Sequence, residues 1–445
     1  MPINRRSMMT ASAALSAMGS QQALAAQPHN KTLLQKLVPN AAFDQTVQLQ
    51  AVIDAAAETN IPVRLPAGTF RFTDLRLRSG TRLLGDHGAT TLIFMGGSAC
   101  VTADLADDLV LRDLVIDGTF LPFETERGNG LLSISRSQRI TIENVEIRSS
   151  VHSGLSLVGV SGRIESCIIR DVHDVGLMSL DATGLDIRNN TVSGCGNNGV
   201  TALRTAVAED GTQITGNRIS NIRNTFGGTG QFGNGVNVYR ASGVIVSGNR
   251  ITDCTYSAIR GNASSNILIT GNSCERLGEV ALYAEFGFEG AVISNNIVDV
   301  AATGIAVVNF NEGGRLAVVQ GNLIRNLFRR EHEPVDTRGI GISVEADTVV
   351  SGNTIENAPT FGVTIGWGRY MRNVSATGNV IRNTKVGIGI SQNVEAGACL
   401  IAQNLISDAI DGAIRAMDHG HVLGPDLTLE PEMLDKVKVV GNVTV

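Results

Sequence analysis

Short stretches in which apolar residues alternate with other residues recur along most of the chain. Each stretch begins with Gly or Ala, as in GVNVY at 235–239, ALYAE at 281–285 and GVTIG at 362–366. Alternation with a period of two is typical of a β-strand with one buried face. The pattern therefore predicts many short strands, each with one side toward a core.

A second motif, in which a polar anchor residue is followed by one variable residue and one apolar residue, precedes each of these strands. Six copies align directly: ITGNRI, VSGNRI, ITGNSC, ISNNIV, VQGNLI and VSGNTI. Their anchors are Asn217, Asn249, Asn272, Asn296, Asn322 and Asn353, with earlier anchors at Leu114, Val145, Cys167 and Asn190 and later ones at Asn379, Asn404 and Asn442. Successive anchors lie 22 to 38 residues apart. The spacing indicates one fixed coil with loops of variable length.

Copies of such a coil bury their apolar faces by stacking, with strands paired in parallel about 4.8 Å apart. We therefore expect an all-β chain, folded as a single-stranded right-handed parallel β-helix of about 12–13 coils. Leucine-rich repeats need Leu-rich motifs and propeller blades need about 40 residues, so neither of these repeat folds fits the sequence. We interpret the Asn anchors as scaffolding, because Asn tolerates a left-handed corner and its side chains can form a ladder between coils.

The two ends of the chain differ from the repeat. Apolar residues at helical spacing predict a helix within 44–59 that covers the first strand edge. A strand, a turn and a second strand follow at 61–72. We assign 44–90 to an N-terminal cap of helix and hairpin and 91–445 to the β-helix. The β-helix is expected to end in an excursion and a closing strand.

Residues 1–25 have the features of an export signal. Arg5 and Arg6 precede a weakly hydrophobic stretch, and Ala23-Leu24-Ala25 supplies a cleavage site. We predict a twin-arginine signal peptide, a linker at 26–43, and the twin-arginine export machinery as a partner. The protein would be periplasmic or secreted in a Gram-negative bacterium; an ordinary secretory signal is the alternative. Export after folding disfavours disulfides, so the six cysteines are expected to be buried thiols.

Composition excludes several classes of protein. Hydrophobic residues make up 43% and charged residues 18%, which excludes a disordered chain, and 50 glycines exclude a bundle of long helices. No run of about 18 apolar residues predicts a membrane span. A net charge of -6 with only five lysines argues against nucleic-acid binding.

The Arg5-Arg6 leader, the helix, the LPAGTF segment and the repeated GN motif together resemble one family. It is the twin-arginine-translocated uncharacterised repeat proteins of bacteria, and the resemblance covers essentially the whole chain. The family implies a fold and a compartment but no established activity. The wider pectate-lyase-like superfamily implies pectate lyases, polygalacturonases, uronate epimerases and tailspike hydrolases. Their catalytic motifs have no counterpart here, and no acidic cluster supports calcium as a cofactor, so the cofactor stays open.

One part of the repeat gathers polar side chains. Counted from the leading Gly or Ala, the second and fourth residues of each alternating stretch are expected to face outward. These positions hold Asn237, Arg260 and Tyr283 beside Tyr239, Asn262 and Glu285 in three adjacent coils, with Arg240 and Asn309 at the fifth position. Long insertions at 220–234 and 325–338 are expected to flank them. We therefore predict a cleft with a polar, aromatic floor.

The residue types in this cleft suit a polysaccharide. Tyr rings match sugar faces, and Arg and Asn match hydroxyls and uronate carboxylates. In a catalytic reading, Glu285 is the general acid or base, Tyr283 or Tyr239 its proton partner, and Arg260 the group that neutralises a substrate carboxylate. Asn237, Tyr239, Arg240, Asn262 and Asn309 would bind substrate.

The reaction class stays open at this point. A lyase or an epimerase needs one carboxylate, whereas a glycoside hydrolase needs a second. The candidates for the second are Glu331, Glu333, Asp336 and Glu345. The alternatives are a non-enzymatic envelope or surface protein that binds glycan or protein, and a purely structural solenoid. We interpret the residues around Trp367 and around His173 as turns rather than as a sugar platform and a metal site.

Overall fold

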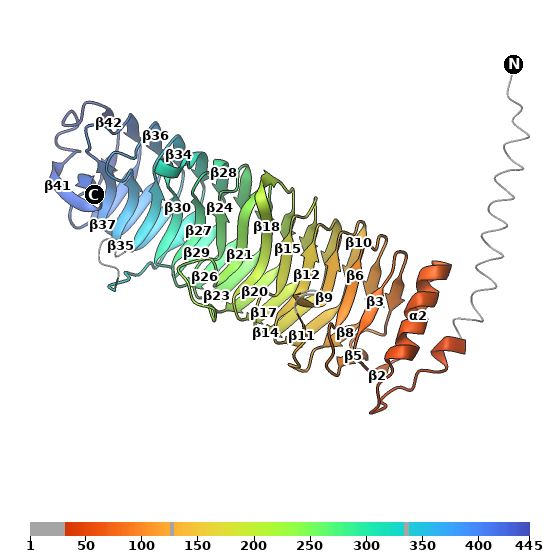
Figure 1. The fold of residues 1–445 in the computed structure, drawn as a ribbon. Coiled ribbons are helices and arrows are strands. Elements are labelled where there is room, and N and C mark those ends of the chain that lie inside the picture. The colour runs from red at the N-terminus through yellow and green to blue at the C-terminus, as the bar shows by residue number, and fades with distance from the viewer. Residues whose placement is uncertain (1–31, 125–128, 333–337) are drawn as a thin grey trace, which may run out of the picture. The chain divides into compact units, whose positions relative to one another are not determined.

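The computed structural model describes residues 32–124, 129–332 and 338–445. The predicted signal peptide and the start of the predicted linker lie outside these residues. Two compact units, Met1–Ile168 and Ile169–Val445, fold as right-handed parallel β-solenoid with about 14 turns in total (Figure 1). The predicted fold is confirmed. The expected number of 12–13 coils is slightly too low, because residues 63–84, which we assigned to the N-terminal cap, already form strands of the first coils.

Each regular coil carries three short strands. In one coil these are β22 (Ile245–Ser247), β23 (Arg250–Cys254) and β24 (Ile259–Asn262). Each pairs in parallel with the equivalent strand of the next coil, as Val246 does with Ile269. Inward residues of these strands, such as Val246 and Ile251, have no exposed surface. The core is therefore a column of stacked aliphatic side chains, as the period-two pattern predicts.

The first unit contains α2 (Thr46–Thr59) and thirteen complete strands. The strands are β1 (Val63–Arg64), β2 (Gly68–Phe72), β3 (Leu75–Leu77), β4 (Arg82–Leu84), β5 (Thr90–Phe94), β6 (Val101–Asp104), β7 (Val110–Arg112), β8 (Val115–Asp117), β9 (Gly130–Ser135), β10 (Ile140–Glu143), β11 (Glu146–Ser150), β12 (Ser153–Val158) and β13 (Gly162–Glu165).

The second unit continues the same three-strand coil. Besides β22, β23 and β24, its strands are β14 (Ile168–Val172), β15 (Leu177–Leu180), β16 (Asp186–Arg188), β17 (Thr191–Cys195), β18 (Asn198–Glu209), β19 (Gln213–Thr215), β20 (Arg218–Ile222), β21 (Asn234–Ser242), β25 (Ile267–Thr270), β26 (Ser273–Leu277), β27 (Val280–Glu285), β28 (Glu289–Ser294), β29 (Ile297–Asp299), β30 (Thr303–Val307), β31 (Arg315–Gln320), β32 (Leu323–Arg325), β33 (Ile340–Val344), β34 (Thr348–Ser351), β35 (Thr354–Ile365), β36 (Val374–Thr377), β37 (Val380–Ser391), β38 (Cys399–Ala402), β39 (Leu405–Ala409), β40 (Ile414–Asp418), β41 (His421–Asp426), β42 (Val437–Val440) and β43 (Val443–Thr444). A 3-10 helix, η2 (Phe310–Glu312), follows β30.

The helix expected near the N-terminus is present, and it packs on the first strands. α2 contacts β3 and β4, and its buried residues are apolar, among them Leu49, Val52 and Ile53. The hairpin expected after it is wrong. β1 pairs in parallel with β4, and β2 pairs in parallel with β5, so the two strands belong to the first coil. A strand–turn–strand pattern looks the same whether the strands pair with each other or with the next coil.

The Asn anchors of the second unit form the expected ladder. Each side-chain Nδ2 donates to the Oδ1 of the anchor in the next coil at 2.9–3.0 Å. The ladder runs through Asn190, Asn217, Asn249, Asn272, Asn296, Asn322, Asn353, Asn379, Asn404 and Asn442. The scaffolding role is therefore confirmed.

The conformational reason that we gave for these Asn residues was wrong. The left-handed residue of each corner is the one before the anchor, with φ of +62° at Gly352 and +56° at Asn295. The anchor itself is absent from the residues with positive φ. The GN motif thus divides two tasks between two residues: Gly turns the chain, and Asn links the coils.

The C-terminal excursion begins with an antiparallel hairpin. β40 pairs with β41, and Val422 of β41 packs against a cluster of Ile340, Phe361, Val386 and Met417. The closing strand is present as β42 and β43, which pair with β38 and β39. The hairpin therefore covers the outer face of the sheet at this end.

All six cysteines are free and buried, as expected. Burial raises the thiol pKa, to about 12 for Cys274. Among the described helices, none has the length and hydropathy of a bilayer-spanning segment.

Candidate functional site

The structure brings the predicted polar residues together on the outer face of β21, β24 and β27. Asn237 pairs with Arg260 and Arg260 with Tyr283, while Tyr239 pairs with Asn262 and Asn262 with Glu285. Parallel pairing places such residues about 4.8 Å apart along the solenoid. We call this group the polar patch; it comprises Asn237, Tyr239, Arg240, Arg260, Asn262, Tyr283, Glu285 and Asn309.

Glu285 lies at the centre of the polar patch and is almost fully buried. Its side chain is 4% exposed, and its Oε1 accepts hydrogen bonds from Arg260 Nε at 2.5 Å and Asn262 Nδ2 at 2.9 Å. Arg260 Nη2 also lies 2.5 Å from this oxygen. Within the described residues, Oε2 accepts no hydrogen bond. One oxygen is therefore fixed by the protein, and the other has no hydrogen-bond partner in the described residues.

The two tyrosines of the polar patch lie beside arginines. The Arg260 guanidinium carbon is 5.8 Å from the Tyr283 ring centre, and that of Arg240 is 4.8 Å from the Tyr239 ring centre. Burial, with a further contribution from the negative charge of Glu285, raises the pKa of Tyr283. Tyr283 is therefore a neutral hydroxyl at physiological pH, able to donate a hydrogen bond but not to act as a base.

The first insertion folds back over part of the polar patch. Gln231 O accepts hydrogen bonds from Asn198 Nδ2 and Asn237 Nδ2, both at 3.1 Å. A Cβ on Gly230 would lie 2.2 Å from Arg260 Nη1, so this part of the insertion lies directly against the Arg260 side chain. Asn237 is 8% exposed as a result. Asn237 and Glu285 therefore face outward from the core as predicted, but other parts of the protein cover them, and both are buried.

Arg338, the last residue of the second insertion, pairs with a residue next to the polar patch. Arg338 Nη2 donates to Glu279 Oε1 at 3.0 Å, immediately before β27, and the charges of both residues act on Tyr283. Glu331 forms an ion pair with Arg329 at 2.9 Å. The candidate carboxylates Glu333 and Asp336 lie outside the described residues.

The structure corrects the register of the next coil. The predicted insertion at 325–338 implies that the next stretch begins at Gly339. Ile305 pairs with Ile342 and Ala306 with Ser343, so the residue equivalent to Gly304 is instead Gly341. The sequence contains both glycines, and a slip of two residues leaves a period-two pattern unchanged. Ser343 moves to the second position, and Glu345 takes the fourth. The fourth-position column therefore continues from Glu285 through one intervening residue, Val308, to Glu345.

Glu345 lies in an environment unlike that of Glu285. Its Oε2 accepts the backbone N–H of Phe310 at 2.6 Å. Burial raises the pKa of Glu345 to about 7, against the opposing effect of hydrogen bonds from the backbone N–H groups of Phe310 and Asn309. Asn309 Oδ1 in turn accepts the backbone N–H of Phe286 at 3.3 Å. Asn309 therefore lies in the segment between Glu285 and Glu345, which hydrogen-bonds to Glu345 on one side and to the residue after Glu285 on the other.

The weaker candidates are turns with local partners. Trp367 and Tyr370 form an antiparallel bridge, and the Trp367 ring meets His419 edge-on at 5.2 Å. Asp171 pairs with Arg170 at 2.5 Å. No group of three or more His, Cys, Asp or Glu in the described part of the chain is placed to hold a metal ion.

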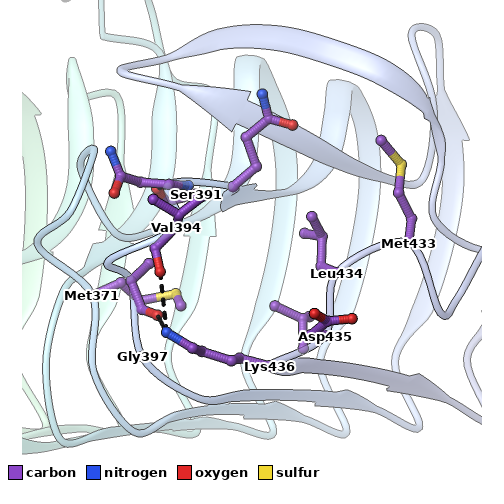
Figure 2. Close-up of a pocket in the computed structure, with 12 residues that line it drawn as sticks. Met371, Ser391, Val394, Gly397, Met433, Leu434, Asp435 and Lys436 are labelled. Atoms are coloured by element: carbon purple, nitrogen blue, oxygen red, sulfur yellow. Dashed lines mark hydrogen bonds between the residues drawn. The ribbon is translucent and has the colours of Figure 1, made fainter.

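A cavity of about 260 Å³ lies near the C-terminus, between residues 391–397 and 433–437 (Figure 2). Lys436 crosses its base, where Nζ donates to Val394 O at 3.1 Å and Ala396 O at 3.0 Å. This cation therefore joins two segments of the chain. Apolar and polar residues both line this cavity, and its polar groups do not form one cluster. The polar patch is therefore the stronger candidate for a functional site.

Comparison with known proteins agrees with the fold. A family model described as right handed beta helix region matches residues 129–206 and 153–324. The surface adhesin PfbA of Streptococcus pneumoniae is similar in structure, with a TM-score of 0.50 at 16% identity over 87% of this chain and 92% of that chain. Together with the strand pairing, these matches define the class: a right-handed parallel β-helix protein.

Two carbohydrate-active enzymes are more distantly similar. The catalytic unit of a GH87 α-1,3-glucanase from Streptomyces thermodiastaticus gives a TM-score of 0.48 at 16% identity, over 92% of this chain and 67% of that chain. The A-module of the Azotobacter vinelandii mannuronan C-5 epimerase AlgE4 gives 0.33 at 16% identity, over 92% and 93%. At such identities the similarity concerns the fold. No curated protein matches the sequence.

Proposed function

We propose that the protein binds a polysaccharide across the polar patch. The observation that carries the proposal is the arrangement around Glu285: a buried carboxylate with one oxygen fixed by Arg260 and Asn262 and the other unpartnered in the described structure. Such a group is positioned in advance for a hydroxyl donor, and the nearby Tyr239 ring offers a face for a sugar.

The charges of the polar patch favour a neutral or weakly acidic glycan. Arg260 is paired with Glu285, and Arg338 with Glu279. Arg240 donates to Thr205 O at 2.9 Å and has no carboxylate partner among the described residues. A single uncompensated positive charge does not favour a polyanionic glycan, because a polyanion binds through many positive charges. Because Arg260 already pairs with Glu285, Arg240 takes the role expected for Arg260 in this proposal, the neutralisation of a carboxylate on a weakly acidic glycan.

The proposal includes the export of the protein. A twin-arginine signal at 1–25, with the export machinery as a partner, would place the protein in the periplasm or outside the cell, where polysaccharides are found. Membership of the twin-arginine-translocated repeat proteins belongs to the same proposal. The second candidate is a non-enzymatic envelope or surface protein. It is favoured by the loop that covers Asn237 and Arg260, because that cover would narrow access to a catalytic group.

Binding to a panel of soluble neutral and uronate polysaccharides tests the proposal. Affinity electrophoresis and titration calorimetry should show binding to at least one neutral glycan, weakened about tenfold by Tyr239→Ala because the ring supplies apolar contact area. Tyr370→Ala is the matched control, since Tyr370 lies in the turn at 367–370.

Two results would count against the polar patch. Absence of binding to every glycan would remove the proposed function. Loss of binding in Tyr370→Ala but not in Tyr239→Ala would move the site to the turn at 367–370.

A further inference from the structure

We infer that Glu285 and Glu345 are the base and the acid of a glycoside hydrolase that inverts the anomeric carbon of a neutral glycan. The inference rests on the proposed function, because the glycan must lie across the polar patch. It goes further by assigning a reaction and a second carboxylate to that surface.

The separation of the two glutamates fits this reaction. They occupy the fourth position of coils that are two steps apart, so their backbones lie roughly 10 Å apart at about 4.8 Å a step. The Glu345 carboxylate accepts the N–H of Phe310, which follows β30 in the intervening coil, so its side chain leans toward Glu285. This brings the carboxyl groups toward the range of about 6.5–9.5 Å that leaves room for a water molecule. Retention would require about 5–5.5 Å.

Glu285 is suited to be the base. Arg260 and Asn262 bind Oε1 and fix the orientation of the carboxylate, and the charge of Arg260 compensates its charge. Oε2 has no partner in the described part of the chain, so it can accept a hydrogen bond from water. The Tyr283 hydroxyl stays neutral and can donate a hydrogen bond to a sugar hydroxyl.

Glu345 is suited to be the acid. Its raised pKa of about 7 means that the carboxyl group carries a proton at neutral and mildly acidic pH. Glu345 Oε2 accepts the Phe310 N–H, which fixes the orientation of the carboxyl group. Two carboxyl groups with environments this different divide the acid and base roles between them.

The reaction balances with water as the only co-reactant. The oxygen of a water bound to Glu285 attacks the anomeric carbon, and Glu285 Oε2 takes the proton of that water. The bond between the anomeric carbon and the glycosidic oxygen breaks as Glu345 gives its proton to that oxygen. The products are a chain with a new, inverted reducing end and a second chain with a free hydroxyl. Exchange with solvent then returns a proton to Glu345 and removes one from Glu285.

Reducing-end release and product configuration test the assignment. The probes are soluble glucans with α-1,3, β-1,3 or β-1,4 linkages, each reduced at its end beforehand. The full chain should release new reducing ends from at least one of them, and NMR should show the first product with inverted configuration. Glu285→Gln and Glu345→Gln should each lower the rate at least about 100-fold, as loss of a general acid or base does.

Glu356→Gln is the matched control. Glu356 is half-exposed and paired with Arg382, outside the polar patch, and its variant should keep full activity. Circular dichroism establishes folding, and Glu345→Asp provides a second variant that keeps a carboxyl group but withdraws it from the substrate.

Each failure has a distinct meaning. Binding that depends on Tyr239 without release of reducing ends would overturn the hydrolase and leave the proposed function intact. Retained configuration, unsaturated products, or full activity in Glu345→Gln would also overturn the assignment. Absence of any binding would remove the proposed function itself.

Discussion

Removal of one amide from the middle of the Asn ladder should destabilise the protein strongly. Asn296 is 1% exposed, and its side chain takes part in four hydrogen bonds. In Asn296→Ala, the backbone N–H of Asn272 and the carbonyl of Ile269 lose this partner in a buried place. A buried polar group left unsatisfied costs about 1–3 kcal/mol, so the free energy of unfolding should fall by about 4 kcal/mol.

The matched control is Asn442→Ala, at the last step of the ladder. Asn442 also bonds to its neighbour Asn404, but it is half-exposed, so water can replace the lost amide. We expect a loss of about 1 kcal/mol there. Equilibrium urea unfolding followed by far-ultraviolet circular dichroism measures both values. If Asn296→Ala costs no more than Asn442→Ala, the ladder does not stabilise the solenoid through buried hydrogen bonds.

Three further predictions concern Gly352, Glu345 and the six cysteines. A Cβ on Gly352 would meet no atom within 4 Å, but φ is +62°, so Gly352→Ala should cost about 1 kcal/mol and Gly352→Asn clearly less, measured by urea unfolding. The pKa of Glu345 is raised from 4.5 to about 7 in the folded state, so the folded protein binds the proton more tightly and the free energy of unfolding falls as pH rises through this window. Relative to Glu345→Gln, the unchanged protein should lose at most about 3 kcal/mol between pH 4 and pH 8, and parallel stability curves of the two proteins would contradict this. The six thiols should resist a thiol reagent in the native state and react in urea, and fast native labelling would show that the solenoid opens locally.

The fold could be predicted because its determinants are local and repeated. The period-two alternation, the GN corner and the Asn anchor recur in coil after coil, so errors in one copy are corrected by the others. The pairing of Asn237 with Arg260 and of Asn262 with Glu285 followed from counting positions within a coil.

The site was less predictable, for two physical reasons. A slip of two residues keeps every side chain on its face, so the sequence could not distinguish Gly339 from Gly341, and Glu345 was placed outside the column. Burial of Asn237 and Arg260 depends on how the insertion at 220–234 folds back. That insertion has no repeated copy, and nothing in its own pattern indicates the surface that it covers.

The Asn ladder gives the second unit a direction. Every amide from Asn190 to Asn404 donates toward the C-terminal neighbour, so the side-chain dipoles add along the row. A single reversed amide would set oxygen against oxygen on one side and N–H against N–H on the other. All amides of the row must therefore have the same orientation. During folding, the amide of each new coil would be oriented by the amide of the coil before it.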